Sequence, residues 1–188
     1  MISRTLSALS FVLLLIIPII VPLPASSFQK RDHLTPQEVD LIKEAQILDK
    51  RIEVFIRAAE RRLIVINGTA ATNAKQLKKD AERWGELPAG SRFELVGDIA
   101  RIYDEAITNI DDVSTRDERN PLIPKALRKL ASSVSSVMEQ LKPLRAQAKT
   151  EGDMASLESL NEYAQSILEA AQKLPPEVDK KAAKKNKN

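Results

Sequence analysis

Apolar residues recur every three or four positions along most of the chain, which is the period of an α-helix. The clearest case is the segment 36–66, where Thr35 and Glu38 are spaced as a capping box at its start. The apolar stripe of this segment is Leu41, Ala45, Leu48, Ile52, Phe55, Ala59, Leu63 and Ile66. The pattern predicts one continuous helix over 36–66 that ends at Asn67-Gly68. Its near-heptad spacing is typical of a coiled-coil seam.

The same spacing predicts one short helix and three further long ones. The short helix would carry Ala74, Leu77, Ala81 and Trp84. The first long helix would carry Phe93, Val96, Ile99, Tyr103, Ile107 (or Ala106) and Ile110. The second would carry Leu127, Leu130, Val134, Val137, Leu141 and Leu144, and the third Met154, Leu157, Leu160, Ala164, Ile167, Ala171 and Leu174. A second capping box, Ser91 with Glu94, opens the first of these three. No segment alternates with the period of two that a strand requires.

The breaks between these helices are predicted from polar and helix-breaking residues. Residues 111–119 form a polar connection, and Asn120-Pro121 can cap the helix that follows. Pro143 lies inside the next stripe and is expected to kink or end that helix near Glu139. Gly152-Asp153 is typical of the end of one helix and the start of the next.

Each predicted helix has one apolar stripe, and such a stripe is stable only when another helix covers it. The sequence therefore predicts an all-α fold, an elongated antiparallel helical bundle of four long helices plus one shorter helix. The interior should be aliphatic. The predicted bundle domain spans 28–174.

The first residues are typical of an export signal. Arg4 precedes an apolar run, and small residues follow at Ala25–Ser27. The run is shorter than the roughly 20 residues of a spanning helix, so 1–27 is predicted to be a cleaved signal peptide. The protein would then be secreted or periplasmic. The alternative is an uncleaved N-terminal membrane anchor.

Composition excludes several kinds of chemistry. The chain has no Cys, one His and five Gly among 188 residues. The absence of Cys rules out disulfides, thiolate metal sites and thiol nucleophiles, and a glycine-rich phosphate loop is not expected. We predict no catalytic residue, no metal site and no cofactor, and hence a protein that is not an enzyme.

The net charge of +3 is concentrated at the C-terminus. The segment 175–188 is predicted to be a disordered tail, and its bases are Lys180, Lys181, Lys184, Lys185 and Lys187. These five lysines are the candidate contacts for a polyanion or an anionic surface. The remaining domain is close to neutral, which argues against specific nucleic-acid binding.

Three groups of polar residues are candidate sites. His33 is the only histidine, and its place before the first helix predicts a solvent-exposed side chain rather than a general base. The acidic residues Asp111, Asp112, Asp117 and Glu118 lack the register and glycine of an EF-hand, so a solvated loop is favoured over a Ca²⁺ site. The serines Ser132, Ser133, Ser135 and Ser136 have no base nearby in sequence, which favours a polar or closely packed helix face over a nucleophile.

Three further features have structural explanations. The charged residues of the first helix, Lys50, Arg51, Glu53, Arg57, Glu60, Arg61 and Arg62, are predicted to form a solvated, ion-paired face. Asn67-Gly68-Thr69 matches a glycosylation acceptor, but a helix end explains it equally well. Trp84, Phe93 and Tyr103 are expected to pack in the core rather than to line a ligand pocket.

These observations favour an exported, non-enzymatic helical bundle that acts through protein–protein contact, as a scaffold, envelope component or chaperone-like protein. The partner is unknown. One form of protein–protein contact is self-association, in which two copies of the chain pair through the near-heptad stripe. The alternative is a binding module for an apolar or anionic small ligand held within the bundle. A hydrolase is the third hypothesis, and no site in the sequence supports it.

Overall fold

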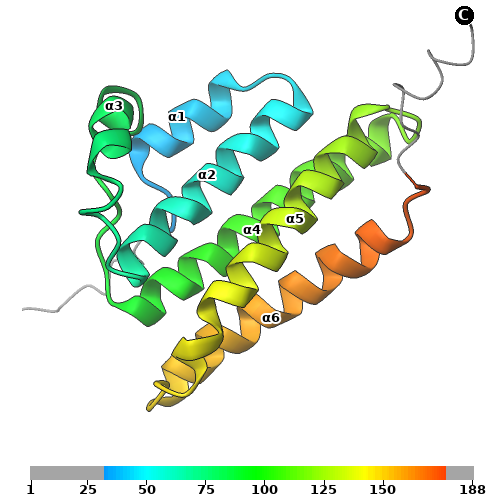
Figure 1. Ribbon diagram of the computed structural model, residues 1–188. Helices are drawn as coiled ribbons and strands as arrows, with labels where there is room; N and C mark the ends of the chain where they lie inside the picture. Colours follow the sequence, from blue (N-terminus) through cyan, green and yellow to red (C-terminus); the bar gives the residue numbers. More distant parts are fainter. Residues whose placement is uncertain (1–31, 177–188) are drawn as a thin grey trace, which may run out of the picture. The chain divides into compact units, whose positions relative to one another are not determined.

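The structure, a computed structural model, describes residues 32–176, and this part of the chain is built from six helices without a strand (Figure 1). The helices are α1 (Pro36–Glu44), α2 (Leu48–Ile66), α3 (Ala74–Trp84), α4 (Arg92–Arg116), α5 (Leu122–Arg145) and α6 (Glu151–Gln172). The predicted all-α fold is therefore confirmed. The predicted signal peptide 1–27 and the five tail lysines lie outside the described residues.

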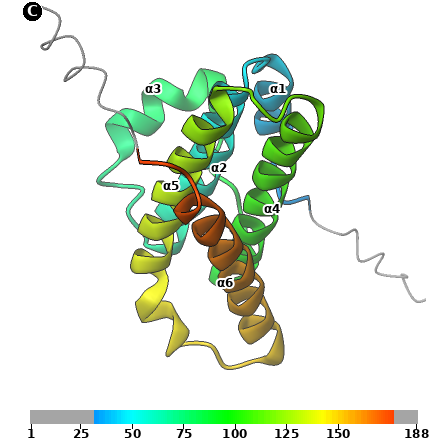
Figure 2. The ribbon, with the colours of Figure 1, turned by 90° about the vertical axis from the view of Figure 1, so that its right-hand side faces the viewer.

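The long helices α2, α4, α5 and α6 form an antiparallel bundle, as predicted, and α4 contacts the other three (Figures 1 and 2). Their apolar stripes meet in one core. Residues exposed by 1% or less come from every long helix and include Ile52, Phe55, Ile99, Tyr103, Leu130, Val134, Leu160 and Ile167. Met154, which was expected in the last stripe, is instead 52% exposed in the first turn of α6.

The predicted single helix over 36–66 is wrong, because the chain turns between α1 and α2. Ile47 is extended and exposed, and the Arg51 Nε–H donates to the Ala45 carbonyl at 2.9 Å across the turn. A straight helix would hold Glu38 and Arg62 about 36 Å apart, at 1.5 Å per residue. In the structure, Glu38 Oε1 lies 2.7 Å from Arg62 Nη1. The turn therefore brings α1 back against α2.

The predicted helix starts are confirmed, and the predicted interruptions are not. The capping boxes at Thr35 and Ser91 both form, and Gly68 adopts a positive φ of 66° after the end of α2. Residues 111–116 continue α4 instead of forming a connection. Pro143 lies in the last turns of α5, where its missing N–H removes one bond near the end, and α5 continues past Glu139 to Arg145.

Gly152 and Asp153, interpreted as a stop and restart, lie in the first turn of α6. Asp153 closes a third capping box with Thr150, and its side chain accepts from the Thr150 N–H at 3.0 Å. Hydrogen bonds from the backbone N–H groups of Lys149 and Thr150 lower the pKa of Asp153. The polar pair therefore starts α6 and does not interrupt it.

None of the helices among residues 32–176 is both long enough and apolar enough to cross a membrane.

An ion-pair cluster connects α2 to α5 at the surface. Asp49 is 3% exposed, and its carboxylate lies 2.5 Å from Lys125 Nζ and 3.2 Å from Lys129 Nζ. Lys129 also pairs with Glu53. The hydrogen bond from Lys125 lowers the pKa of Asp49 below its ordinary value of 3.8; burial opposes this shift and Lys129 adds to it.

We expect the stabilising effect of Asp49 to depend on acidity. A lowered pKa stabilises the folded state above the ordinary pKa, and this contribution is lost as the pH falls through the lower value of the folded state. Urea denaturation at several pH values from about 5 to 2 should therefore show wild type and Asp49→Asn converging in stability. Asp40→Asn removes an exposed carboxylate and serves as the control. Parallel curves for wild type and Asp49→Asn would contradict the assignment.

Candidate functional site

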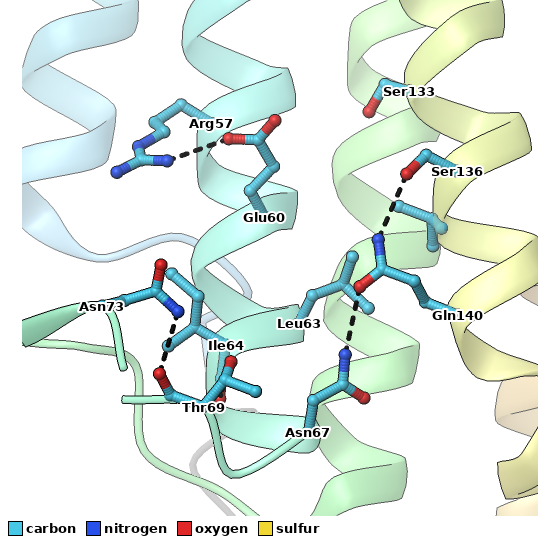
Figure 3. A pocket seen from close by; sticks show the side chains of 11 residues that line it. Arg57, Glu60, Leu63, Ile64, Asn67, Thr69, Asn73, Ser133, Ser136 and Gln140 are labelled. Atoms are coloured by element: carbon cyan, nitrogen blue, oxygen red, sulfur yellow. Dashed lines mark hydrogen bonds and ion pairs between the residues drawn. The ribbon is translucent and has the colours of Figure 1, made fainter. Parts of the chain in front are cut away.

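A polar cleft lies between α2, the turn that follows it and α5 (Figure 3). Its volume is about 290 Å³. Six of its lining side chains are amides or hydroxyls: Asn67, Thr69, Asn73, Ser133, Ser136 and Gln140. These groups come from parts of the chain that are far apart in sequence, so the cleft exists only in the folded bundle.

The end of α2 shapes one wall of the cleft. Asn67 ends the helix, and the positive φ of Gly68 lets the chain turn away from the helix axis. The turn is then held by the Asn73 side-chain amide, which donates to the Thr69 carbonyl at 2.8 Å. As a result, the side chains of residues 67, 69 and 73 line the same cleft.

The opposite wall is one face of α5. Ser133, Ser136 and Gln140 follow one another at spacings of three and four residues, which places them on one side of the helix. The sequence indicated a polar face around Val134, and the structure confirms this for Ser133 and Ser136. It also shows that this face lines a cleft, which the sequence did not indicate.

A chain of hydrogen bonds joins the two walls (Figure 3). The Asn67 side-chain amide donates to Gln140 Oε1 at 3.1 Å, and Gln140 Nε2 donates to Ser136 Oγ at 3.1 Å. A side-chain amide carries two donors and an acceptor with two lone pairs, so both amides keep hydrogen-bonding capacity for a ligand.

The charged residues at the rim of the cleft balance one another. Arg57 lies 3.0 Å from Glu60 and 2.6 Å from Asp80 of α3. Burial disfavours ionisation of Asp80, but hydrogen bonds from Arg57 and Gln76 outweigh it and lower the pKa of Asp80. Because two carboxylates share the Arg57 charge, this rim does not form a cationic site.

The hydroxyl of Ser133 lies 3.0 Å from the Tyr103 hydroxyl. Burial raises the pKa of Tyr103, so its phenol stays protonated at neutral pH and cannot serve as a general base. His33 is distant in the fold: its Nε2 lies 2.8 Å from a Glu105 oxygen. Its side chain is only 17% exposed, so the expectation of a solvent-exposed histidine is wrong.

Two of the cations of α2, Arg61 and Arg62, belong to a buried ion cluster with residues of α1 and α4. Glu38, Arg61, Arg62 and Asp98 are each exposed by 1% or less. Glu38 Oε2 accepts from Arg62 Nη2 at 2.8 Å, and Glu38 Oε1 accepts from Arg61 Nε at 3.3 Å. The predicted solvated face is therefore wrong at Arg61 and Arg62. Of the remaining residues of that face, Lys50 pairs with Glu53 and Arg57 with Glu60 at the surface. Arg51 instead donates to the Ala45 carbonyl and to Asn109 Oδ1.

Arg61 also holds the end of α3. Its guanidinium donates to the carbonyls of Trp84, Gly85 and Glu86, and the Trp84 ring centre lies 5.7 Å from Arg61 Cζ. Burial lowers the pKa of Arg61, and the nearby Glu38 partly compensates. Trp84 therefore packs on a cation, whereas Tyr103 lies in the core as expected.

The acidic residues at the end of α4 lie along the last turns of the helix and just beyond it. Within the described part of the chain, no three His, Asp or Glu side chains are grouped closely enough to hold a metal ion. Asp111 and Asp112 belong to α4, where their carbonyls accept from Thr115 and Arg116.

Comparison with known proteins finds no matching family model, no matching curated protein and no matching solved structure for this chain.

Proposed function

We propose that the protein is a non-enzymatic binding protein whose cleft between α2 and α5 takes a neutral, polar peptide segment of a partner protein. The observation that supports this proposal is the convergence of three side-chain amides and three hydroxyls on one cleft. Amides offer donors and acceptors together, and a peptide backbone presents the same two kinds of group.

The charge and size of the cleft favour this ligand over the alternatives. An anionic ligand would need a free cation, and Arg57 is shared by Glu60 and Asp80. The apolar hollow between α5 and α6, lined by Leu141, Leu157 and Leu160, measures only about 90 Å³ and is too small for most apolar ligands. The cleft volume is at the lower end of the roughly 300–1,000 Å³ of small-ligand sites, so only a few residues of a peptide would enter.

The hydrogen-bond partners in the cleft argue for binding rather than hydrolysis. A serine nucleophile needs a base that removes its proton, and the group beside Ser133 is the protonated Tyr103 phenol. The polar groups of the cleft are arranged as donors and acceptors for a bound molecule, and this is consistent with action through protein–protein contact.

The proposal is tested by titrating the ¹⁵N-labelled protein with acetylated and amidated tetrapeptides composed of Ser, Asn, Gln and Gly. We expect shifts of backbone amide signals confined to residues 67–73 and 133–140. Gln140→Ala should weaken binding by about two- to tenfold, as expected when one or two hydrogen bonds are lost. Gln165→Ala, an exposed glutamine on α6, is the matched control.

Three results would refute the proposal, and two of them concern the peptides. One is the absence of saturable shifts at the cleft with any neutral peptide. The other is tighter binding of peptides in which Ser is replaced by Asp or Glu, because this would identify an anion site instead. If Gln140→Ala binds the peptides as tightly as Gln165→Ala does, the cleft is not the binding surface.

A further inference from the structure

The outer side of α3 carries a row of cations. An exposed carboxylate, Glu82, lies on the same side, and Arg83 at its edge also lines a hollow with Glu44 and Glu53. The cations Lys75, Lys78, Lys79 and Arg83 are all exposed, and Lys75, Lys79 and Arg83 follow one another every four residues. Their Cα atoms are therefore about 6 Å apart along the helix. None of the four forms an ion pair with any residue in 32–176.

The outer side of α6 carries a matching row of carboxylates. The helix contains five acidic residues and no basic one. Glu151, Glu158, Glu162 and Glu169 lie at spacings of seven, four and seven residues, which aligns them along one face. That face is opposite the buried Leu160 and Ala164, and in the described structure its four carboxylates have no ion-pair partner.

The two rows cannot neutralise each other within one molecule. Helix α3 contacts α1 and, through Arg57 with Asp80 and Arg61 with Trp84, also α2, whereas α6 contacts α4 and α5. In both views of the ribbon, α3 and α6 lie on different sides of the bundle (Figures 1 and 2). The charges between α2 and α5 behave differently, because Asp49 and Glu53 are neutralised by Lys125 and Lys129 of the same chain.

Within their own helices, Arg83 in the last turn of α3 and Glu151 in the first turn of α6 suit the helix dipole, but several of the other charges are unfavourable. Like charges four residues apart repel, as do Lys75 with Lys79 and Glu158 with Glu162. Lys75 is in the first turn of α3, and Glu169 is in the last turn of α6. Both positions are unfavourable with respect to the helix dipole. The rows therefore suit contact with an oppositely charged surface.

We propose that this surface belongs to a second copy of the chain: the cationic row of α3 docks on the acidic row of α6 of the next copy. The α3 row extends over about 12 Å and the α6 row over about 27 Å, at 1.5 Å per residue, so the shorter row fits along the longer one. The contact joins two different surfaces, so the assembly is head to tail and forms a ring or an open chain.

This route to self-association differs from the one indicated by the near-heptad stripe. The residues of that stripe are buried inside the molecule: Ile52, Phe55 and Ala59 pack against the other helices. Both charged rows lie outside the α2–α5 cleft, so the assembly is independent of the proposed peptide binding. Exposed charges are screened over about 3 Å at 1 M salt and about 30 Å at 0.01 M, so association should require low salt.

Sedimentation velocity over a concentration series at 10 mM and 300 mM NaCl tests the assembly. At 10 mM the weight-average sedimentation coefficient should rise with concentration, and at 300 mM self-association should be at least about tenfold weaker. A protein that remains monomeric at 10 mM NaCl over the whole concentration series would overturn the proposal.

Charge reversal then assigns the two surfaces. Lys75→Glu/Lys78→Glu/Lys79→Glu and Glu158→Lys/Glu162→Lys/Glu169→Lys should each be monomeric alone, and mixing the two variants should restore association. The matched control is Arg119→Glu/Lys149→Glu/Lys173→Glu, which reverses three exposed cations elsewhere and should associate as wild type does. Helical circular dichroism verifies that every variant is folded.

The outcome at α3 identifies the cationic partner. If the α6 variant is monomeric and the α3 variant still associates, the cations come from another part of the chain and the proposal is wrong. If the mixed variants fail to associate, the two rows do not meet. Either result overturns the α3–α6 contact, whatever the outcome of the peptide titration.

Discussion

Replacing Glu38 by alanine is expected to lower the free energy of unfolding by about 3–5 kcal/mol, because it leaves two buried guanidinium groups without their shared carboxylate. Glu38 is fully buried and lies within 3.3 Å of both Arg61 and Arg62. Removal of one partner from a buried pair costs far more than removal of an exposed pair. Urea denaturation at neutral pH measures the change.

Two further substitutions separate the ion cluster from the helix cap, because Glu38 also accepts from the Thr35 backbone N–H. Thr35→Ala removes the side-chain cap and keeps the ion pairs, so it should cost only about 0.5–2 kcal/mol. Glu44→Ala removes an exposed carboxylate at the other end of α1 and should change stability by less than about 0.5 kcal/mol. A loss for Glu38→Ala no larger than that for Thr35→Ala would contradict the role of the cluster.

Phe55→Ala is expected to destabilise the protein by about 3–5 kcal/mol, because Phe55 is 1% exposed in the core and its loss leaves a cavity. Ile52→Ala, at a fully buried position, should cost about 2–5 kcal/mol for the same reason. Chemical denaturation monitored by circular dichroism gives both values.

The control for these core substitutions is Ile47→Ala, since Ile47 is 55% exposed in the turn before α2. Its effect should stay within about 0.5 kcal/mol. Near-neutral results for both Ile52→Ala and Phe55→Ala would show that the α2 stripe is not packed inside the bundle, and would restore this stripe as a surface for a partner.

The bundle could be predicted from the sequence because its determinants are local and repeated. Apolar residues at helical spacing define each long helix, and the Thr35 and Ser91 caps define two of the starts. The turn between α1 and α2 could not be predicted in this way. Residues 45–47 are Ala-Gln-Ile, which contain neither Gly nor Pro, and the turn depends on the distant contact of Glu38 with Arg61 and Arg62.

One signal for the buried arginines was present in the sequence. Arg62 lies three residues after Ala59 and four before Ile66, so it belongs to the apolar face of α2. A cation on such a face needs a buried carboxylate, which pointed to an acidic partner elsewhere in the chain. The cleft had no equivalent signal, because it depends on how the end of α2 aligns with Gln140 of α5.

The placement of α3 has a consequence for how this protein can diversify. Because α2 and α4 run antiparallel, the end of α2 and the start of α4 lie at the same end of the bundle, and a short loop would connect them (Figure 1). The connection is instead the long segment 67–91, which includes α3, and no residue of α3 is buried. Such a segment can be shortened, lengthened or exchanged with little effect on the core, provided that the carbonyls bound by Arg61 are kept. Related chains can therefore share the four-helix framework and differ in the surface that α3 provides.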